Sequence, residues 1–494
     1  MPDTPNPNEP ERPDDQPDFE AMLRSLFGTG DQADVQRALG AMGFDQVDPA
    51  TMGMIGAQLK AMFSGGSADE PFNVSLATDV ARKAVSAEGD ATVSTVASRE
   101  VQQAVQVATL WLDEVTDFAA PSAGAAALSR AEWVERTMPV WRQLVEPVAA
   151  GVGTAIQGAM REQLGGADAS MMPGLPAGFD PSALLGQMEP MLQRMSGAMF
   201  GMQLGQAVGA LAGDLVSGTE VDLPLVPGHV VALLPANVAA FSEGLQVDDE
   251  QVRLYLAVRE AARVRLFAEV PWLGPQLVAA VQDYARDINI DTEGIESAMR
   301  GVDPSDPEAL QQALSGSLFH PEPSTAQKSA LTRLETYLAL VEGWVDVVTR
   351  QATSGHLPQA DALGESVRRR RATAGPAERT FSQLVGLELR PRRLRDATNL
   401  WAALESAGGV SLRDGAWAHP DVAPTAADLD DPLGYVERAR SGDRGSEFDE
   451  ALDALLREGA DASGATGSAT DDDTTRPDRG PDETGDDPPG AGDR

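Results

Sequence analysis

The chain has 494 residues and a net charge of −38, from 76 acidic and 38 basic side chains. This excess of negative charge argues against affinity for nucleic acids or anionic membranes. The chain has no cysteine, which excludes disulfides, thiolate metal sites and cysteine nucleophiles. Its first residues form neither the basic region nor the apolar core of a secretory signal, so we expect a cytoplasmic protein.

Both ends of the chain are acidic and poor in apolar residues. Residues 1–20 carry seven acids against one arginine, and residues 461–494 carry ten acids against three arginines. Such segments cannot bury enough apolar surface to offset the entropy lost on ordering. We therefore expect an acidic leader with short helices and a linker over 1–72, a folded domain over 73–440, and an acidic disordered tail over 441–494.

The central part of the chain is rich in Ala, Val and Leu with helical periodicity. Helices are predicted over residues 19–27, 34–44, 98–118, 129–160, 248–268, 275–287, 307–315, 326–352 and 377–387. Pro139 and Pro147 should kink or divide the fourth of these. The best strand candidate is 221–241, whose β-branched runs are interrupted by Pro and Gly. The expected fold class is mainly α, a helical domain with a small β element.

A glycine recurs every fourth residue in one predicted helix, at Gly197, Gly201, Gly205, Gly209 and Gly213. This spacing places all five on one ridge of the helix and removes the side chains from it. Close packing against another backbone is the expected reason. The alternative is a membrane-associated protein that inserts residues 196–213. Gln203 and Gln206 argue against it, so no stable membrane span is expected.

The sequence Arg259-Glu-Ala-Ala-Arg263 has the spacing of the H-E-x-x-H zinc motif. Residues four apart lie on one helix face, where two histidines can hold a zinc ion while the glutamate polarises a water. Arginine has no lone pair to donate and repels a dication. Taken alone, the string is typical of a solvated helix face.

The surroundings of this string carry a resemblance. Four segments together resemble the zincin-like metallopeptidase family of actinobacteria: 234–245, 265–273, 338–348 and 418–438. Members of this family are often labelled hydrolases or coenzyme-F420-biosynthesis-associated proteins. The resemblance covers about residues 75–440. It implies a largely helical zincin-like domain with zinc as cofactor and a peptidase site.

Under this resemblance, the two histidine ligand positions fall on Arg259 and Arg263. Glu260 would be the catalytic general base, Glu342 the third ligand and Asp346 a supporting residue. Because both histidines are replaced, no metal is expected. We therefore expect a catalytically impaired protein that binds or scaffolds a protein or peptide partner. The alternative is an active zinc-dependent metalloprotease that uses substitute ligands, with Glu260 as its base.

Charge balance makes a further prediction about this helix. Buried carboxylates without a dication are costly unless cations pair with them. Arg259 and Arg263 are therefore expected to pair with Glu342 or Asp346, and the alternative is that both point to solvent. The four histidines, His229, His320, His356 and His419, form no i, i+4 pair and are not expected to be ligands.

A basic island stands out in this acidic chain. It consists of Arg368–Arg371 with Arg379, Arg390, Arg392, Arg393 and Arg395. The island lacks interleaved aromatics and any nucleic-acid motif, so we expect no nucleic acid there. Plain solvation or docking of an acidic tail is the expected role.

Overall fold

A computed structural model of the chain describes residues 70–165, 181–286, 324–372 and 393–441. These residues form twelve helices and two short strands, which confirms the mainly helical class with a small β element. Four predicted helices, at 19–27, 34–44, 307–315 and 377–387, and the tails expected to be disordered lie outside the described residues.

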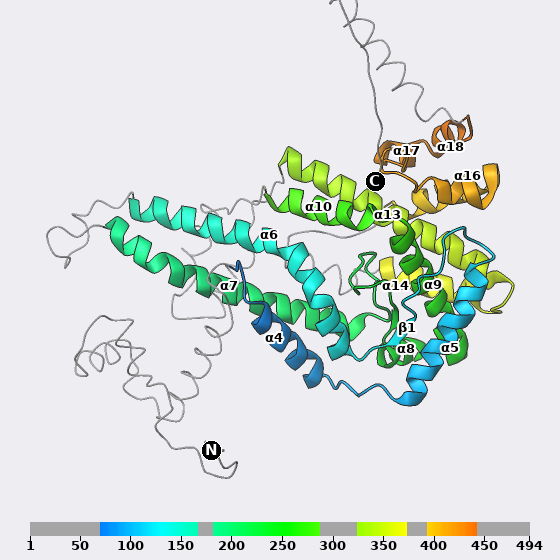
Figure 1. The fold of residues 1–494 in the computed structure, drawn as a ribbon, viewed down its shortest axis with the longest axis horizontal. Coiled ribbons are helices and arrows are strands. Elements are labelled where there is room, and N and C mark those ends of the chain that lie inside the picture. The colour runs from blue at the N-terminus through cyan, green and yellow to red at the C-terminus, as the bar shows by residue number, and fades with distance from the viewer. Residues whose placement is uncertain (1–69, 166–180, 287–323, 373–392, 442–494) are drawn as a thin grey trace, which may run out of the picture. The chain divides into compact units, whose positions relative to one another are not determined.

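The helices are α4 (Val74–Ala87), α5 (Thr95–Leu112), α6 (Arg130–Gly165), α7 (Pro181–Asp214), α8 (Pro235–Ser242), α9 (Asp249–Glu269), α10 (Leu273–Arg286), α13 (Thr325–Ser354), α14 (Ala360–Ala372), α16 (Leu394–Gly415), α17 (Ala426–Asp430) and α18 (Pro432–Ser441). The strands are β1 (Ala125–Ala127) and β2 (Val231–Leu233). Helix α6 keeps both internal prolines, Pro139 and Pro147, and Figure 1 shows it bent rather than divided. Proline removes a helical hydrogen bond and clashes with the preceding turn, which accounts for a bend.

The glycine ridge of α7 packs against α4, as its spacing predicts. A Cβ on Gly201 would lie 2.8 Å from the carbonyl oxygen of Asn73, and one on Gly205 would lie 2.5 Å from that of Ala77. The helices therefore approach so closely that only glycine fits at these positions. No helix among the described residues is both long and apolar enough to cross a membrane.

The strand predicted over 221–241 is wrong for most of its length. Within this range only Val231–Leu233 forms a strand, which pairs in parallel with Ala125–Ala127. Pro235 then begins α8 from an extended residue, Leu234, since proline is favourable at the first helical position. Asp222 has a left-handed backbone conformation, with φ 60°, which interrupts a strand. β1 is an alanine run with little strand propensity, so it went unpredicted.

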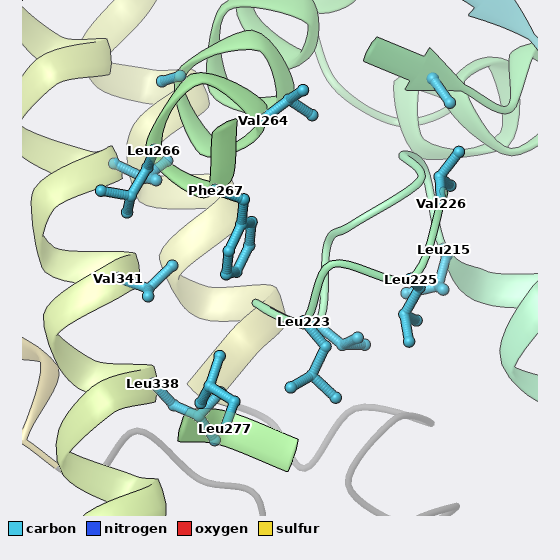
Figure 2. Packing of buried hydrophobic residues seen from close by; sticks show 14 of the residues in the cluster. Leu215, Leu223, Leu225, Val226, Val264, Leu266, Phe267, Leu277, Leu338 and Val341 are labelled. Carbon is cyan, nitrogen blue, oxygen red and sulfur yellow. The ribbon is translucent and has the colours of Figure 1, made fainter. Parts of the chain in front are cut away.

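Helix α9 is surrounded by other elements and buries nearly all its middle residues. It packs against α5, α8, α13, α14 and β2. The side chain of Asp248 caps its start by accepting from Glu250 N at 2.9 Å. Figure 2 shows the apolar packing next to its end, where Leu266 and Phe267 lie near Val341 of α13. A helix buried all round normally carries apolar residues, yet α9 buries three arginines and a glutamate.

Candidate functional site

Glu342 of α13 lies between the two arginines of α9. Nη2 of Arg259 donates to its Oε1 atom, and Nη2 of Arg263 donates to its Oε2 atom at 3.1 Å. The three side chains are at most 5% exposed. Both guanidiniums therefore face the carboxylate inside the protein, as the charge argument predicts, and the alternative that they point to solvent is wrong.

A second acid, Asp222, and a third helix, α14, also contribute to this cluster. Nε of Arg263 donates to Oδ1 of Asp222 at 2.8 Å. Arg371 of α14 contacts Oδ2 of Asp222 and also donates to Oε2 of Glu342 at 3.0 Å. Neither residue was expected at this site, although Arg371 belongs to the basic island noted in the sequence. Asp222 lay within a predicted strand, and nothing in the sequence indicated that Arg371 comes next to α9.

Asp346 lies one turn after Glu342 on α13 and contacts three arginines. Its carboxylate lies 3.8 Å from Nη1 of Arg259, 3.3 Å from Nη1 of Arg368 and 2.6 Å from Nη2 of Arg350. We name Arg259, Arg263, Arg371, Asp222, Glu342 and Asp346 the arginine–carboxylate network. It joins α9, α13, α14 and the loop that holds Asp222.

The role expected for the Arg368–Arg371 run needs correction. Arg368 and Arg371 pair with acids of the network, and Arg370 lies 3.4 Å from the carboxylate of Glu220. Only Arg369 is largely exposed, at 78% of its side chain, and it pairs with Glu365 on its own helix. Solvation therefore describes one arginine of the four, because the acids beside α14 pair with the other three.

Glu260 is fully buried. It accepts from Ser217 Oγ at 2.7 Å, from Thr219 N at 2.9 Å and from Thr219 Oγ1 at 3.0 Å. Arg263 donates to the same carboxylate at 3.3 Å. Burial raises the pKa of Glu260, while Arg263 and these hydrogen bonds oppose the rise. A carboxylate offers about four acceptor positions, so Glu260 is occupied in fastening the Ser217–Thr219 turn to α9.

The two carboxylates that Arg263 and Arg371 share differ in proton affinity. Burial raises the pKa of Asp222 to about 6, because it outweighs the attraction of Arg371 and Arg263 and adds to the repulsion from Glu342. Burial alone would also raise the pKa of Glu342, but Arg259, Arg371 and Arg263 together lower it to about 2. Glu342 is therefore ionised at neutral pH, and an added proton goes first to Asp222.

The donor set at this position does not fit zinc. Two of the three positions expected from the resemblance to hold ligands, Arg259 and Arg263, present guanidiniums, which have no lone pair for a metal. Within the described ranges, no group of three or more His, Cys, Asp or Glu side chains is arranged to hold a metal ion. His229 is exposed, His356 stacks on Trp111 and His419 is 63% exposed. His320 lies outside the described residues.

A small pocket lies beside the network. Its polar lining residues are Ser217, Glu220, Arg259, Arg263, Arg370 and Arg371. Phe241, Leu256 and Val367 provide apolar wall. The enclosed volume is about 10 Å³, roughly the room that one water molecule needs.

Comparisons with known proteins agree with this architecture. A family model described as zincin-like metallopeptidase matches residues 72–436, more than half of the chain. One solved structure, described as "a putative hydrolase with a novel fold", comes from Chloroflexus aurantiacus; it is 16% identical with a TM-score of 0.50, over 74% of this chain and 98% of that chain. At this identity the likeness shows the fold alone. A search of curated proteins finds no match. The chain belongs to the zincin-like metallopeptidase family.

Proposed function

We propose that this chain is a metal-free member of its family, catalytically impaired as a zinc hydrolase, which binds or scaffolds a protein or peptide partner. The observation that carries the proposal is the bridging of Glu342 by Arg259 and Arg263. The family's third ligand position is thus paired with cations that stand at the other two. Because the chain has no cysteine to form disulfides, we assign it to the reducing cytoplasm.

The energetics of burial support this proposal. A buried carboxylate that loses its only cationic partner costs about 3–5 kcal/mol. Here Glu342 contacts three guanidiniums and Asp222 contacts two. A zinc ion placed beside Glu342 would have to displace arginines that cannot deprotonate at neutral pH. The network thus supplies the positive charge that the ion would otherwise bring.

The alternative, an active zinc peptidase with substitute ligands, receives less support. Such a site needs neutral imidazoles or free carboxylates, together with a base that reaches a metal-bound water. The carboxylates near Arg259 are already engaged by arginines, and Glu260 accepts four hydrogen bonds from the protein. The histidines that the structure describes stand elsewhere on the fold.

Peptide hydrolysis by the full-length chain tests the proposal. The purified protein is incubated with a library of fluorogenic peptides, with added zinc and with a chelator. We expect no hydrolysis that zinc stimulates, and no difference between the native chain and Glu260→Gln. Zinc-stimulated cleavage that disappears in Glu260→Gln would establish the active peptidase instead.

A further inference from the structure

The last turn of α14 is attached to the rest of the fold by arginine side chains. Leu363 and Val367 are the large apolar side chains that α14 buries, at 1% and 6% exposure. After Val367, none of the described side chains of α14 is buried. Arg368, Arg370 and Arg371 instead reach carboxylates on other elements. Polar contacts, rather than buried apolar side chains, therefore hold this end of the helix.

The seam between α14 and α9 is not closely packed. It encloses about 10 Å³, lined among others by Leu256 and Arg259 of α9 and by Val367, Arg370 and Arg371 of α14. Protein interiors leave few voids of the size of a water molecule. Because atoms beside a void lack contacts on one side, the two helices lose less on separating here than at a close-packed seam.

Arg371 fills a set of acceptors that other elements provide. Its Nη1 atom donates to the carbonyl oxygen of Glu220 at 2.8 Å and to Oε2 of Glu342 at 3.0 Å. Its Nη2 atom donates to Oδ2 of Asp222. Both carboxylates are 1% exposed, whereas the Arg371 side chain is 15% exposed. The planar fork of a guanidinium suits such acceptors, so they form a guanidinium site that the last turn of α14 occupies.

Without the arginines of α14, the charges of the neighbouring elements do not balance. Five carboxylates would then share three guanidiniums, namely Asp222, Glu220, Glu260, Glu342 and Asp346 with Arg259, Arg263 and Arg350. Buried carboxylates are costly unless cations pair with them. A cationic segment can therefore take the place of this end of α14, whereas an acidic or purely apolar segment cannot.

We infer that α14 is an intramolecular latch, and that an arginine of a protein partner replaces Arg371 between Asp222 and Glu342 when the latch opens. The inference rests on the proposed function, because it names the chemistry of the partner that the chain binds. Both guanidiniums compete for the same acceptors, so the closed latch lowers the apparent affinity for the partner. The net charge of −38 attracts a basic segment to this chain.

Titration of the full-length protein with a basic peptide tests the site. The probe is an acetylated and amidated pentapeptide of alanines with arginine at its centre. The comparison peptide has citrulline there, which keeps the shape of arginine without its charge. Arg371→Ala empties the site and should bind the arginine peptide at least about tenfold more tightly than the native chain does. It should bind the citrulline peptide at least about tenfold more weakly than the arginine peptide.

Three results of this titration overturn the inference. They are failure of Arg371→Ala to bind the arginine peptide, equal affinity for the two peptides, and equal affinity of the native chain and the variant. Arg369→Ala is the matched control, because it removes the same charge from the exposed face of α14, and it should bind as the native chain does. Arg371→Gln replaces Arg371→Ala, with the same expected ratios, if circular dichroism shows that the latter does not fold.

Hydrogen exchange in the native chain tests the latch itself. An excess of the arginine peptide should speed exchange of the backbone amides in the last turn of α14 at least about tenfold, because it competes with the closed state. The citrulline peptide at the same concentration should leave these rates unchanged. Amides of α4 report any global unfolding and should not respond. Exchange in α14 that stays constant, or that rises equally with both peptides, overturns the latch.

Zinc content is measured on the same preparation. A zinc-free protein whose Arg371→Ala variant binds no arginine peptide contradicts only the present inference. A protein with one zinc per chain contradicts the proposed function, whatever its affinity for the peptides. The two failures are therefore distinguishable.

Discussion

Arg259 of α9 donates through Nη2 to Oε1 of Glu342 on α13, at the centre of the fold. Under the proposed function, both positions correspond to zinc ligands of the family. In this chain the guanidinium of Arg259 instead binds the carboxylate of Glu342. An ion pair thus joins α9 to α13. The arginine side chain occupies the space beside Glu342.

Replacing Glu342 by glutamine should destabilise the protein strongly. The change leaves Arg259, Arg263 and Arg371 without a shared anion, and breaking a buried pair costs about 3–5 kcal/mol. The free energy of unfolding at pH 7, measured in urea, checks this. Glu365→Gln, in an exposed pair with Arg369, is the control and should change little. Similar unfolding curves for both variants would contradict the contribution of the network to the free energy of unfolding.

The effect of Glu342→Gln should also depend on pH. The pKa of Glu342 is lowered from 4.5 to about 2, so its ionised form stabilises the fold fully above about pH 4.5. This contribution is lost as the pH falls through 2. The difference between the native chain and Glu342→Gln should therefore shrink in acid, whereas a difference independent of pH would contradict the assigned charge.

Asp222→Asn should show the opposite pH dependence. The pKa of Asp222 is raised from 3.8 to about 6, so the folded state holds a proton that the unfolded chain releases. The stability from that proton is fully present below about pH 4 and is lost as the pH rises through 6. Asparagine stays neutral and tolerates the left-handed backbone. Between pH 4 and 7 the variant should gain about 2 kcal/mol relative to the native chain. Parallel stability curves in urea would contradict this prediction.

Gly205→Ala should destabilise the contact between α4 and α7. The new Cβ would lie 2.5 Å from the carbonyl oxygen of Ala77 and 2.7 Å from Cβ of Val80. Overpacking of this kind costs about 1–3 kcal/mol. Gly213→Ala is the matched control, because its Cβ meets only the end of the Glu88 side chain, at 3.0 Å. Thermal unfolding should separate the two variants, and equal melting temperatures would contradict the close approach at Gly205.

Arg259→His combined with Arg263→His should create a zinc site. Two imidazoles one turn apart on α9, together with Glu342, restore the three-ligand set of the family. Adding Arg371→Gln should tighten binding, because that guanidinium contacts Glu342. Zinc bound per chain after dialysis measures the effect, with Arg263→His alone as the control. A folded double variant that takes up no zinc would show that these side chains do not converge.

Much of the helical frame and one part of the site could be predicted from the sequence. Periodicity placed α9, α10 and α13 within two residues of their ends, and the glycine spacing predicted the packing of α7. The helices predicted over 98–118 and 129–160 differ from α5 and α6 by up to six residues at their ends. The pairing of Arg259 and Arg263 with Glu342 followed from charge balance. Asp222 and Arg371 could not be predicted, because their contacts depend on a turn and on a helix, α14, that periodicity does not position in space. The short parallel pairing of β1 and β2 rests on backbone hydrogen bonds rather than on a side-chain pattern. The alanine run of β1 therefore gave no strand signal in the sequence.

Zinc content of the full-length native chain tests the central claim most directly. The protein is saturated with zinc, dialysed against zinc-free buffer and measured by elemental mass spectrometry. Because guanidiniums stand at two of the three proposed ligand positions and pair with the third, Glu342, we predict far less than one zinc per chain. One tightly held zinc per chain, lost on Glu342→Gln, would contradict the claim that arginines replace the metal.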